Sequence, residues 1–305
     1  MNKPRRAPRR RVDGVLLLDK PIGITSNAAL QKARWLFNAE KAGHTGTLDP
    51  LATGLLPLCF GEATKFAGEL LGADKSYRAT LKLGVTTDTA DAEGKVQQVR
   101  PVEVDADSWR IAMADFRGQI EQIPPMHSAL KRDGAPLYQY ARQGIELERE
   151  ARQVTVHRLE LVSFFGEEAV IDVDCSKGTY VRTLAADIGE KLGCGAHLTA
   201  LRRTRIGGLD VIDAIPLADL EALSVDSRDN RLLAVDSLLA NVPMVRLDSG
   251  ESEQMRHGQG IRREGPPGLR YRLYATNGAF IGLGEQSADG WLNPRRLIAT
   301  IPITR

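Results

Sequence analysis

Residues 43–54 are Gly-His-Thr-Gly-Thr-Leu-Asp-Pro-Leu-Ala-Thr-Gly, a glycine-rich stretch without hydrophobic periodicity. Glycines allow backbone conformations that side chains forbid and let another molecule approach closely, so we expect a loop over 40–57. Pro50 fixes its own φ and favours an extended Asp49. The Asp49 carboxylate is thereby immobilised between two leucines, a setting in which aspartate can act as a nucleophile. Taken alone, an Asp-Pro pair more often simply opens a turn.

The sequence around this loop predicts an α+β fold, with helices and strands mixed along the chain. Helices are expected over 26–37, 63–71, 105–116, 137–142, 179–192, 217–223 and 231–239. Strands are expected over 14–19, 77–83, 154–165, 169–175 and 197–206. From Pro243 onward, glycine-rich turns separate short strands, which predicts a small all-β barrel.

Charge and composition divide the chain into three parts. Residues 1–11 hold six basic residues and no acidic one, although the whole chain carries only +2. We therefore expect a basic, disordered arm over 1–12, which either contacts phosphates or is a solvated tail. A main domain over 13–242 follows, with a charge-dense insertion at 127–152, and then a β domain over 243–305.

Several classes of protein are disfavoured by motifs that the sequence lacks. The three cysteines are widely spaced and form no Cys-x-x-Cys pair, which argues against a disulfide framework or a zinc ribbon. We find neither of the glycine-rich loops that bind nucleotide phosphates. The apolar runs are far shorter than a membrane span. We therefore expect a cytoplasmic protein that uses no metal, no nucleotide cofactor and no other cofactor, and that binds no membrane.

A second polar segment, Asp74-Lys-Ser-Tyr-Arg-Ala79, places an aromatic ring between two cations. Tyr77 opens an alternating strand and has Lys75 and Arg78 on either side. Such a ring can stack on a nucleobase while the cations meet phosphates. The alternative is a tyrosine that packs on the edge of a sheet.

A third polar segment, Cys175-Ser-Lys-Gly-Thr-Tyr-Val-Arg-Thr-Leu184, joins a strand to a helix. Tyr180 and Arg182 are expected in the first helical turn, where the helix dipole disfavours a cation. Arg182 should therefore have a carboxylate or phosphate partner. A surface arginine is the competing interpretation.

Together these segments resemble the family of bacterial pseudouridine synthases that act on uridine-55 in the T-loop of tRNA. The resemblance covers roughly residues 13–240, and 245–303 resemble more weakly the small RNA-binding PUA barrel of such enzymes. The matching stretches are 14–21, 43–54, 61–65, 75–79, 84–91, 176–184 and 197–203. One position departs from the pattern, because His127 stands where tyrosine or phenylalanine is expected.

The resemblance implies a central mixed, mostly antiparallel sheet flanked by helices, and it implies functional residues. Asp49 would be the nucleophile, attacking either C6 of the base or C1′ of the ribose, with Arg182 as its partner and Tyr77 stacked on the flipped-out uracil. His44 would fill the space left by the base. The other implied substrate-binding residues are Lys20, Tyr180, Leu201, Arg142 and Arg202.

The partner implied is tRNA, bound through its T-arm by a monomer, with the insertion as a clamp. Two alternatives stay open: a non-catalytic tRNA-folding chaperone, which would not need Asp49 or Arg182, and a synthase for another RNA. A hydrolase is disfavoured, because the sequence shows neither a Ser/His/Asp arrangement nor a metal-binding cluster.

Overall fold

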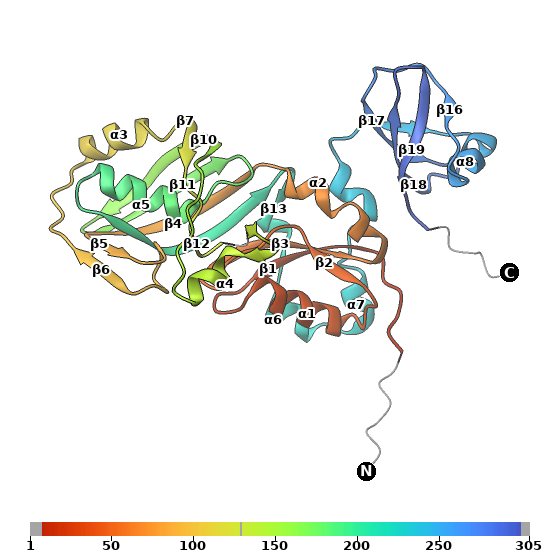
Figure 1. Ribbon diagram of the computed structural model, residues 1–305. Coiled ribbons are helices and arrows are strands. Elements are labelled where there is room, and N and C mark those ends of the chain that lie inside the picture. The colour runs from red at the N-terminus through yellow and green to blue at the C-terminus, as the bar shows by residue number, and fades with distance from the viewer. Residues whose placement is uncertain (1–7, 129, 300–305) are drawn as a thin grey trace, which may run out of the picture.

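Two apolar runs, residues 15–18 and 55–60, form adjacent buried strands of a large sheet (Figure 1). They lie in β1 (Gly14–Lys20) and β3 (Ala52–Phe60), which pair antiparallel from Gly14 opposite Phe60 to Lys20 opposite Gly54. The computed structural model describes residues 8–128 and 130–299. Both strands are almost wholly buried, because helices and loops cover both faces of this part of the sheet.

The large sheet has ten strands in the order β14-β1-β3-β12-β4-β11-β10-β7, with β2 added to β3 and β13 to β12. Its pairs are antiparallel except β1–β14 and β3–β12, so the predicted mixed, mostly antiparallel sheet is confirmed. The remaining strands are β2 (Ala42–His44), β4 (Lys75–Leu83), β7 (Gly118–Gln122), β10 (Arg152–Phe165), β11 (Glu168–Cys175), β12 (Ala196–Ile206), β13 (Leu209–Asp210) and β14 (Ile215–Pro216).

Helices flank this sheet. They are α1 (Ser26–Leu36), α2 (Ala67–Leu71), α3 (Ala106–Ala114), α4 (Leu137–Arg142), α5 (Val181–Lys191), α6 (Leu217–Ala222) and α7 (Val225–Asp229), with 3-10 turns η1 (Gly61–Lys65), η2 (Val211–Asp213) and η3 (Val235–Leu239). Two short hairpins complete this part: β5 (Val85–Thr87) with β6 (Val96–Val99), and β8 (Lys131–Arg132) with β9 (Ala135–Pro136).

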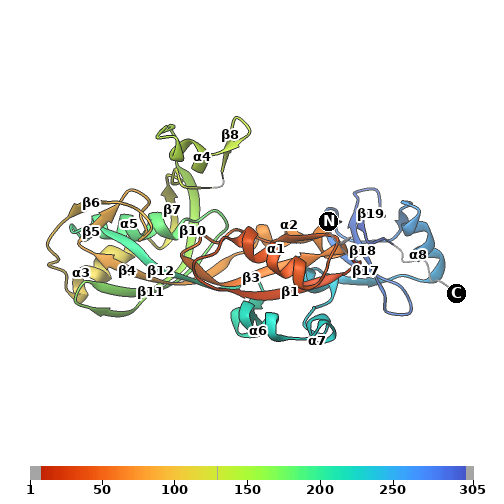
Figure 2. The same ribbon diagram turned by 90° about the horizontal axis from the view of Figure 1, so that it is seen from below.

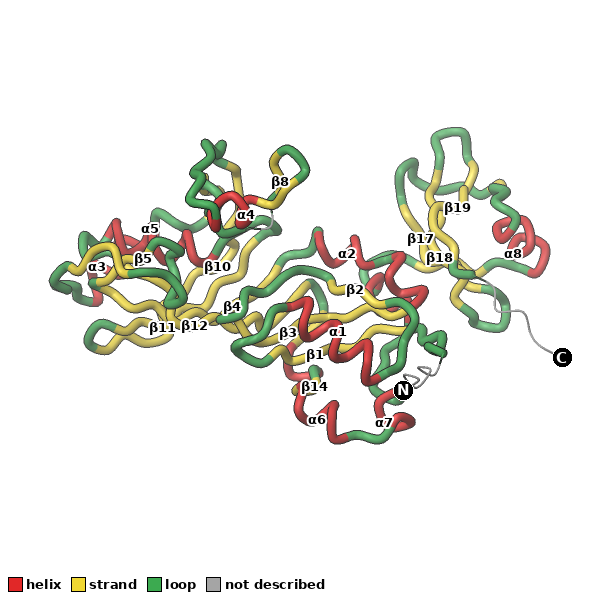
Figure 3. Tube along the Cα trace, turned by 60° about the horizontal axis from the view of Figure 1, so that its bottom comes forward, coloured by secondary structure: helices red, strands yellow, loops and turns green. Residues whose placement is uncertain are grey.

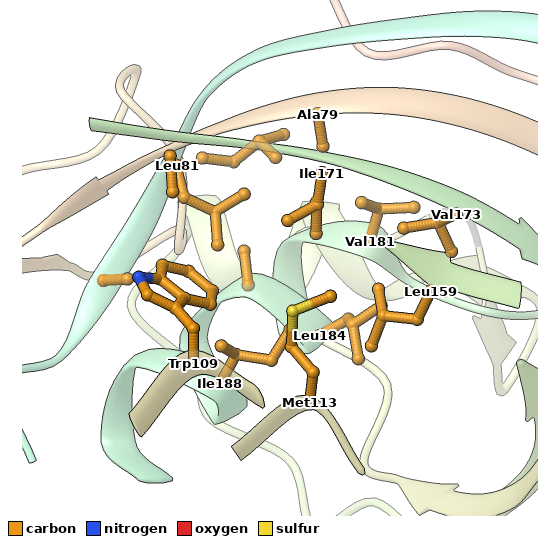
Figure 4. Close-up of a cluster of buried hydrophobic side chains, with 14 of the residues drawn as sticks. Ala79, Leu81, Trp109, Met113, Leu159, Ile171, Val173, Val181, Leu184 and Ile188 are labelled. Atoms are coloured by element: carbon orange, nitrogen blue, oxygen red, sulfur yellow. The ribbon is translucent and has the colours of Figure 1, made fainter. Parts of the chain in front are cut away.

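The apolar side chains of β4 alternate with polar ones, and this alternation places the core on one face of the sheet. Ala79 and Leu81 point toward α3 and α5, where Trp109 and Ile188 pack against them (Figure 4). The intervening Arg78 and Lys82 lie on the other face and pair with acidic residues of the β10–β11 hairpin region. The face without helices is therefore held by exposed ion pairs across neighbouring strands.

The C-terminal part is a second sheet of five strands in the order β15-β17-β18-β19-β16. It curls around its own apolar cluster into a half-barrel, which agrees with the predicted PUA-like fold. Its strands are β15 (Met244–Arg246), β16 (Ile261–Arg262), β17 (Arg270–Tyr274), β18 (Phe280–Gln286) and β19 (Trp291–Leu297). Phe280 packs edge-on against Phe66, so a shared apolar cluster joins the two sheets. The domain limits at 242 and 243 stay predictions.

Four local predictions were wrong. The expected loop over 40–57 contains β2 and the start of β3, because the apolar run after Gly54 extends the strand backward. The helix expected over 63–71 breaks at Phe66 into η1 and α2. The helix expected over 231–239 is only the turn η3, and α7 precedes it. The C-terminal part also contains a helix, α8 (Ser249–Arg256), which a capping box between Asp248 and Glu251 starts.

The N-terminal arm is shorter than predicted. Residues 1–7 lie outside the described part of the chain. Arg10 donates two hydrogen bonds to the Asp229 carboxylate and one to the Phe37 carbonyl, and Val12 is buried. The Asn38 side chain also donates to the Pro8 carbonyl (3.0 Å), so the chain is attached to the body from Pro8 onward.

The insertion stands away from the large sheet, beside the ends of β7 and β10 (Figures 2 and 3). It contains the β8–β9 hairpin and the short helix α4, which begins and ends where the sequence predicted. Among the described residues of the insertion, Leu137 is the buried apolar side chain. With so little apolar surface buried, the insertion should open at low free-energy cost.

Candidate active site

Helix α1 anchors the Asp49 loop through Ser26, its first residue. The Ser26 hydroxyl donates to the Leu48 carbonyl (3.0 Å) and accepts from the Leu48 amide (2.7 Å). Ser26 is therefore the first helical residue and a loop anchor, while the Thr25 side chain caps the helix. The Asp49 carbonyl accepts from the Ala52 amide (3.0 Å). These bonds fix the backbone and leave the Asp49 side chain 41% exposed.

Lys20 lies beneath the same loop, fully buried at the end of β1. Its ammonium donates to the carbonyls of Pro21 (2.9 Å), Ile24 (2.7 Å) and Pro50 (3.4 Å). Burial lowers the pKa of Lys20 to about 8. The structure thus uses Lys20 to join the 21–24 turn to the Asp49 loop, and its substrate-binding role stays a prediction.

Replacing Lys20 with methionine should lower the free energy of unfolding by about 1–3 kcal/mol, because three carbonyls lose a buried donor. Urea denaturation at pH 7 measures this, with Lys32→Met in an exposed ion pair as the matched control. The pH dependence adds a second check. Between the folded pKa of about 8 and the ordinary 10.5, the unfolded chain binds the proton more tightly. Wild-type stability should therefore rise relative to the variant across this window, and parallel curves would contradict the assignment.

Arg182 is buried at the start of α5 and connects four segments. Its Nε lies 3.1 Å from an Asp49 carboxylate oxygen, and its Nη1 lies 3.3 Å from the carboxylate of Asp91. Nη1 also donates to the Thr89 carbonyl (3.2 Å), and Nη2 donates to the His127 carbonyl (2.7 Å). The prediction that the helix dipole would require an acidic partner for Arg182 is confirmed. The bonds also tie the insertion, which begins at His127, to the same guanidinium.

Asp91 belongs to this cluster, although no role for it was predicted from the sequence. It is 3% exposed, and its second carboxylate oxygen accepts from the Thr89 hydroxyl (2.5 Å) and the Glu93 amide (3.1 Å). The only sequence signal was its place in the 84–91 stretch. A buried carboxylate requires a charged partner, and Arg182 supplies it.

Tyr77 on β4 and Leu201 on β12 are both partly buried against the two apolar clusters of the large sheet. Burial raises the pKa of Tyr77, and the nearby Asp49 charge acts in the same direction. The ring therefore carries a neutral phenol at neutral pH, close to Asp49. The charge of Asp49 thus reaches the Tyr77 ring, and the stacking role of Tyr77 stays a prediction.

His44 ends β2 and is half-buried. Burial lowers the pKa of His44, and the positive charge of Arg203 lowers it further, so its ring is neutral at pH 7. Its Nδ1 is buried and has no hydrogen-bond partner among residues 8–128 and 130–299.

Tyr180 precedes α5 instead of lying in its first turn. The Gln122 side chain accepts from the Tyr180 amide (3.0 Å) and donates to its carbonyl (3.3 Å), so the end of β7 holds the residue that precedes the helix. Burial raises the pKa of the Tyr180 hydroxyl, and the charges of Arg182 and Asp49 both reach it. Tyr180 therefore lies at the site, although its position was wrongly predicted.

The structure does not place Arg142 and Arg202 in the Asp49–Arg182 cluster. Arg142 is exposed on α4 in the insertion, with its guanidinium 5.3 Å from the ring centroid of Tyr138. Arg202 lies on β12 and makes a two-bond ion pair with Asp19 (2.6 and 3.0 Å). Within the described ranges no group of three metal-binding side chains occurs, and no helix there is long and apolar enough to cross a membrane.

The arrangement of the large sheet is that of a pseudouridine synthase fold. A chain in an H/ACA RNP bound to a substrate RNA containing 2′-deoxyuridine has the same fold, with TM-score 0.71 and 23% identity over 94% of this chain and 85% of that chain. A chain of a Cbf5-Nop10-Gar1 complex aligns with TM-score 0.68 and 28% identity, covering 90% and 78% respectively.

Sequence comparison identifies the particular family. Residues 34–181 match the N-terminal domain of the TruB family pseudouridylate synthases, 182–242 match the tRNA pseudouridylate synthase B C-terminal domain, and 243–298 match the C-terminal domain of pseudouridine synthase II TruB. The tRNA pseudouridine synthase B of Chromobacterium violaceum is 57% identical over 98% of both chains. That of Aromatoleum aromaticum is 57% identical over 98% of this chain and 97% of its own. The chain belongs to the TruB family of pseudouridine synthases.

Proposed function

We propose that this protein converts uridine-55 in the T-loop of tRNA to pseudouridine, with Asp49 as the nucleophile. The curated relatives that match nearly the full chain carry the name tRNA pseudouridine synthase B, which supports tRNA as the substrate. The observation that carries the mechanism is the Asp49 carboxylate, partly exposed and fixed 3.1 Å from the buried Arg182 guanidinium. Arginine is always charged, and its guanidinium orients the carboxylate oxygens by a charge-assisted contact.

The reaction breaks the N1–C1′ bond, turns the uracil and forms a C5–C1′ bond. C5 releases a proton and N1 gains one, so no electron acceptor and no group donor enters the balance. Asp49 attacks C6 of the base or C1′ of the ribose, and both routes stay open. Its role is covalent in either case, dividing one difficult step into two easier ones.

Arg182 and Asp91 keep the Asp49 carboxylate in place. Asp91 occupies one edge of the guanidinium while Asp49 occupies another. Because Asp91 is buried and bonded on its other oxygen, the guanidinium has little freedom to turn away. The nucleophile is thus oriented before substrate binds, which lowers the entropic cost of reaching the transition state.

Tyr77 is proposed to stack on the uracil once the nucleotide has left the T-loop, at a cost of a few kcal/mol. Its ring packs against both apolar clusters, as Leu201 does. A neutral His44 suits the proposed role of filling the space left by the base, because no charged group then needs to be desolvated between stacked bases.

The insertion is proposed to clamp the T-arm. It projects from the sheet beside the start of α5, and it carries the exposed cations Lys131, Arg132 and Arg142 (Figure 2). The bond from Arg182 to the His127 carbonyl connects the base of this clamp with the nucleophile. When RNA contacts the insertion, it can therefore shift Arg182, the residue that orients Asp49.

A shorter basic arm should contribute phosphate contacts, since Arg10 belongs to the body. Removing residues 2–9 deletes four cations, Lys3, Arg5, Arg6 and Arg9, and should reduce the slope of log affinity against log salt by about 1–3. Glutamine at the same four positions should reproduce the effect without shortening the chain. A slope unchanged in both variants would make the arm a passive tail.

The substrate is tested by mapping pseudouridine in RNA mixtures. The protein is incubated with tRNA transcripts and with unrelated structured RNAs, and modified positions are read by carbodiimide treatment and primer extension. A single new stop at position 55 of tRNA is expected. Stops confined to another RNA would establish a different substrate, and binding without any stop would favour the chaperone.

A further inference from the structure

Arg203 is a buried cation for which the mechanism above has no use. It lies on β12 next to the exposed pair formed by Arg202, yet its own side chain is only 1% exposed. No carboxylate lies within 4.0 Å of its guanidinium among the residues that the structure describes. A charge buried without a counter-ion is costly unless hydrogen bonds and nearby dipoles offset the loss of hydration. The position therefore calls for an explanation.

The hydrogen bonds of Arg203 converge on the proposed site. Nε donates to the Leu55 carbonyl (2.8 Å), and Nη2 donates to the Gly46 carbonyl in the Asp49 loop (3.2 Å). Tyr77 lies directly opposite Arg203 on β4, and the guanidinium charge reaches its hydroxyl.

The sheet register explains why Arg203 reaches these groups. It lies opposite Tyr77 in the β12–β4 pair and opposite Gly54 in the β3–β12 pair. Gly54 has φ of +97°, and a Cβ there would come within 2.3 Å of the Arg203 carbonyl. Glycine at 54 therefore lets β12 approach β3 closely enough for the guanidinium to pass beneath the Asp49 loop.

We propose that Arg203 is a positioning residue for the isomerisation, which acts by holding the Asp49 loop and by placing a buried positive charge opposite Tyr77. The inference rests on the proposed function, since Tyr77 matters there as the face that receives the uracil. The same guanidinium holds Gly46, three residues before the nucleophile.

The charge of Arg203 also affects the pKa of the Tyr77 hydroxyl. Burial raises the pKa of Tyr77 and Arg203 opposes that rise, while Asp49 and Cys175 are the other titratable groups that act on the ring. Removing Arg203 should therefore move Tyr77 ionisation to higher pH. A residue that merely filled space would leave this ionisation unchanged.

The first test follows Tyr77 directly and needs no activity. The chain has six tyrosines, which are labelled with ¹³C at Cζ, and the Tyr77 resonance is assigned by its loss in Tyr77→Phe. The resonance should titrate at higher pH in Arg203→Met than in wild type. The titration of Tyr77 should stay unchanged in Lys82→Met, which removes an exposed cation from β4, the strand that contains Tyr77. Identical titration in Arg203→Met and wild type would overturn the proposal.

The second test is a double-mutant cycle on the single-turnover rate with tRNA transcript. Arg203→Met should lower the rate about tenfold in the wild-type background but only about threefold in the Tyr77→Phe background, because there only its bond to the Asp49 loop is lost. Equal losses in both backgrounds would reduce Arg203 to a structural role. Arg203→Gln, which is also uncharged, replaces Arg203→Met in both tests if circular dichroism shows the latter unfolded. A wild-type protein without turnover would refute the proposed function and leave the titration result standing.

Discussion

Asparagine in place of Asp49 should lower the single-turnover rate of pseudouridine formation by about a thousandfold or more, because the amide cannot form the covalent bond to the substrate. The side chain is 41% exposed and nearly the same size, so the fold should be unaffected. Affinity for tRNA should stay within about threefold of wild type, since the amide oxygen can still accept from Arg182. Tritium release from C5-labelled transcript and filter binding measure the two quantities.

The matched control for this substitution is Asp219→Asn, which makes the same change on the exposed surface of α6. It should leave both rate and affinity at wild-type values. Turnover by Asp49→Asn near the wild-type rate would remove Asp49 from the mechanism, whatever the control showed.

Methionine in place of Arg182 should have the second largest effect, on stability as well as rate. It leaves Asp91 buried and unpaired, which should cost about 3–5 kcal/mol of unfolding free energy. It also frees Asp49 from its charged partner, and the rate should fall by about a hundredfold or more. Urea denaturation and single-turnover assays measure the two effects.

The two effects of Arg182 can be separated with a second substitution at Asp91. The double variant Arg182→Met, Asp91→Asn buries no unpaired charge, so most of the lost stability should return. The rate should stay low, because Asp49 still lacks its partner. Recovery of the rate together with stability would show that Arg182 serves the fold alone.

Much of the fold could be predicted because hydrophobic patterns encode it locally. The alternation along β4 and the apolar run of β1 identify strands in the sequence alone. The start of β3 could not be predicted in this way. Its residues follow a glycine-rich loop, and pairing with β1 and β12, both distant in sequence, makes them a strand.

The site was predicted in part for a similar reason. Local sequence shows that Arg182 at a helix start needs an anion, but it cannot show that Asp91 shares the guanidinium with Asp49. Nor can it show that Lys20 and Arg203 are buried beneath the loop, because lysine and arginine are usually exposed. These contacts depend on strand register, which a motif does not contain.

Tritium release from a transcript labelled at C5 of every uridine tests most directly whether the protein isomerises one uridine of tRNA by means of Asp49. Wild-type protein should release one equivalent of tritium per tRNA, and none from a transcript with cytidine at position 55. Asp49→Asn should release none from either RNA at the same protein concentration. Release from the cytidine-55 transcript, or from wild-type transcript with Asp49→Asn, would contradict the account.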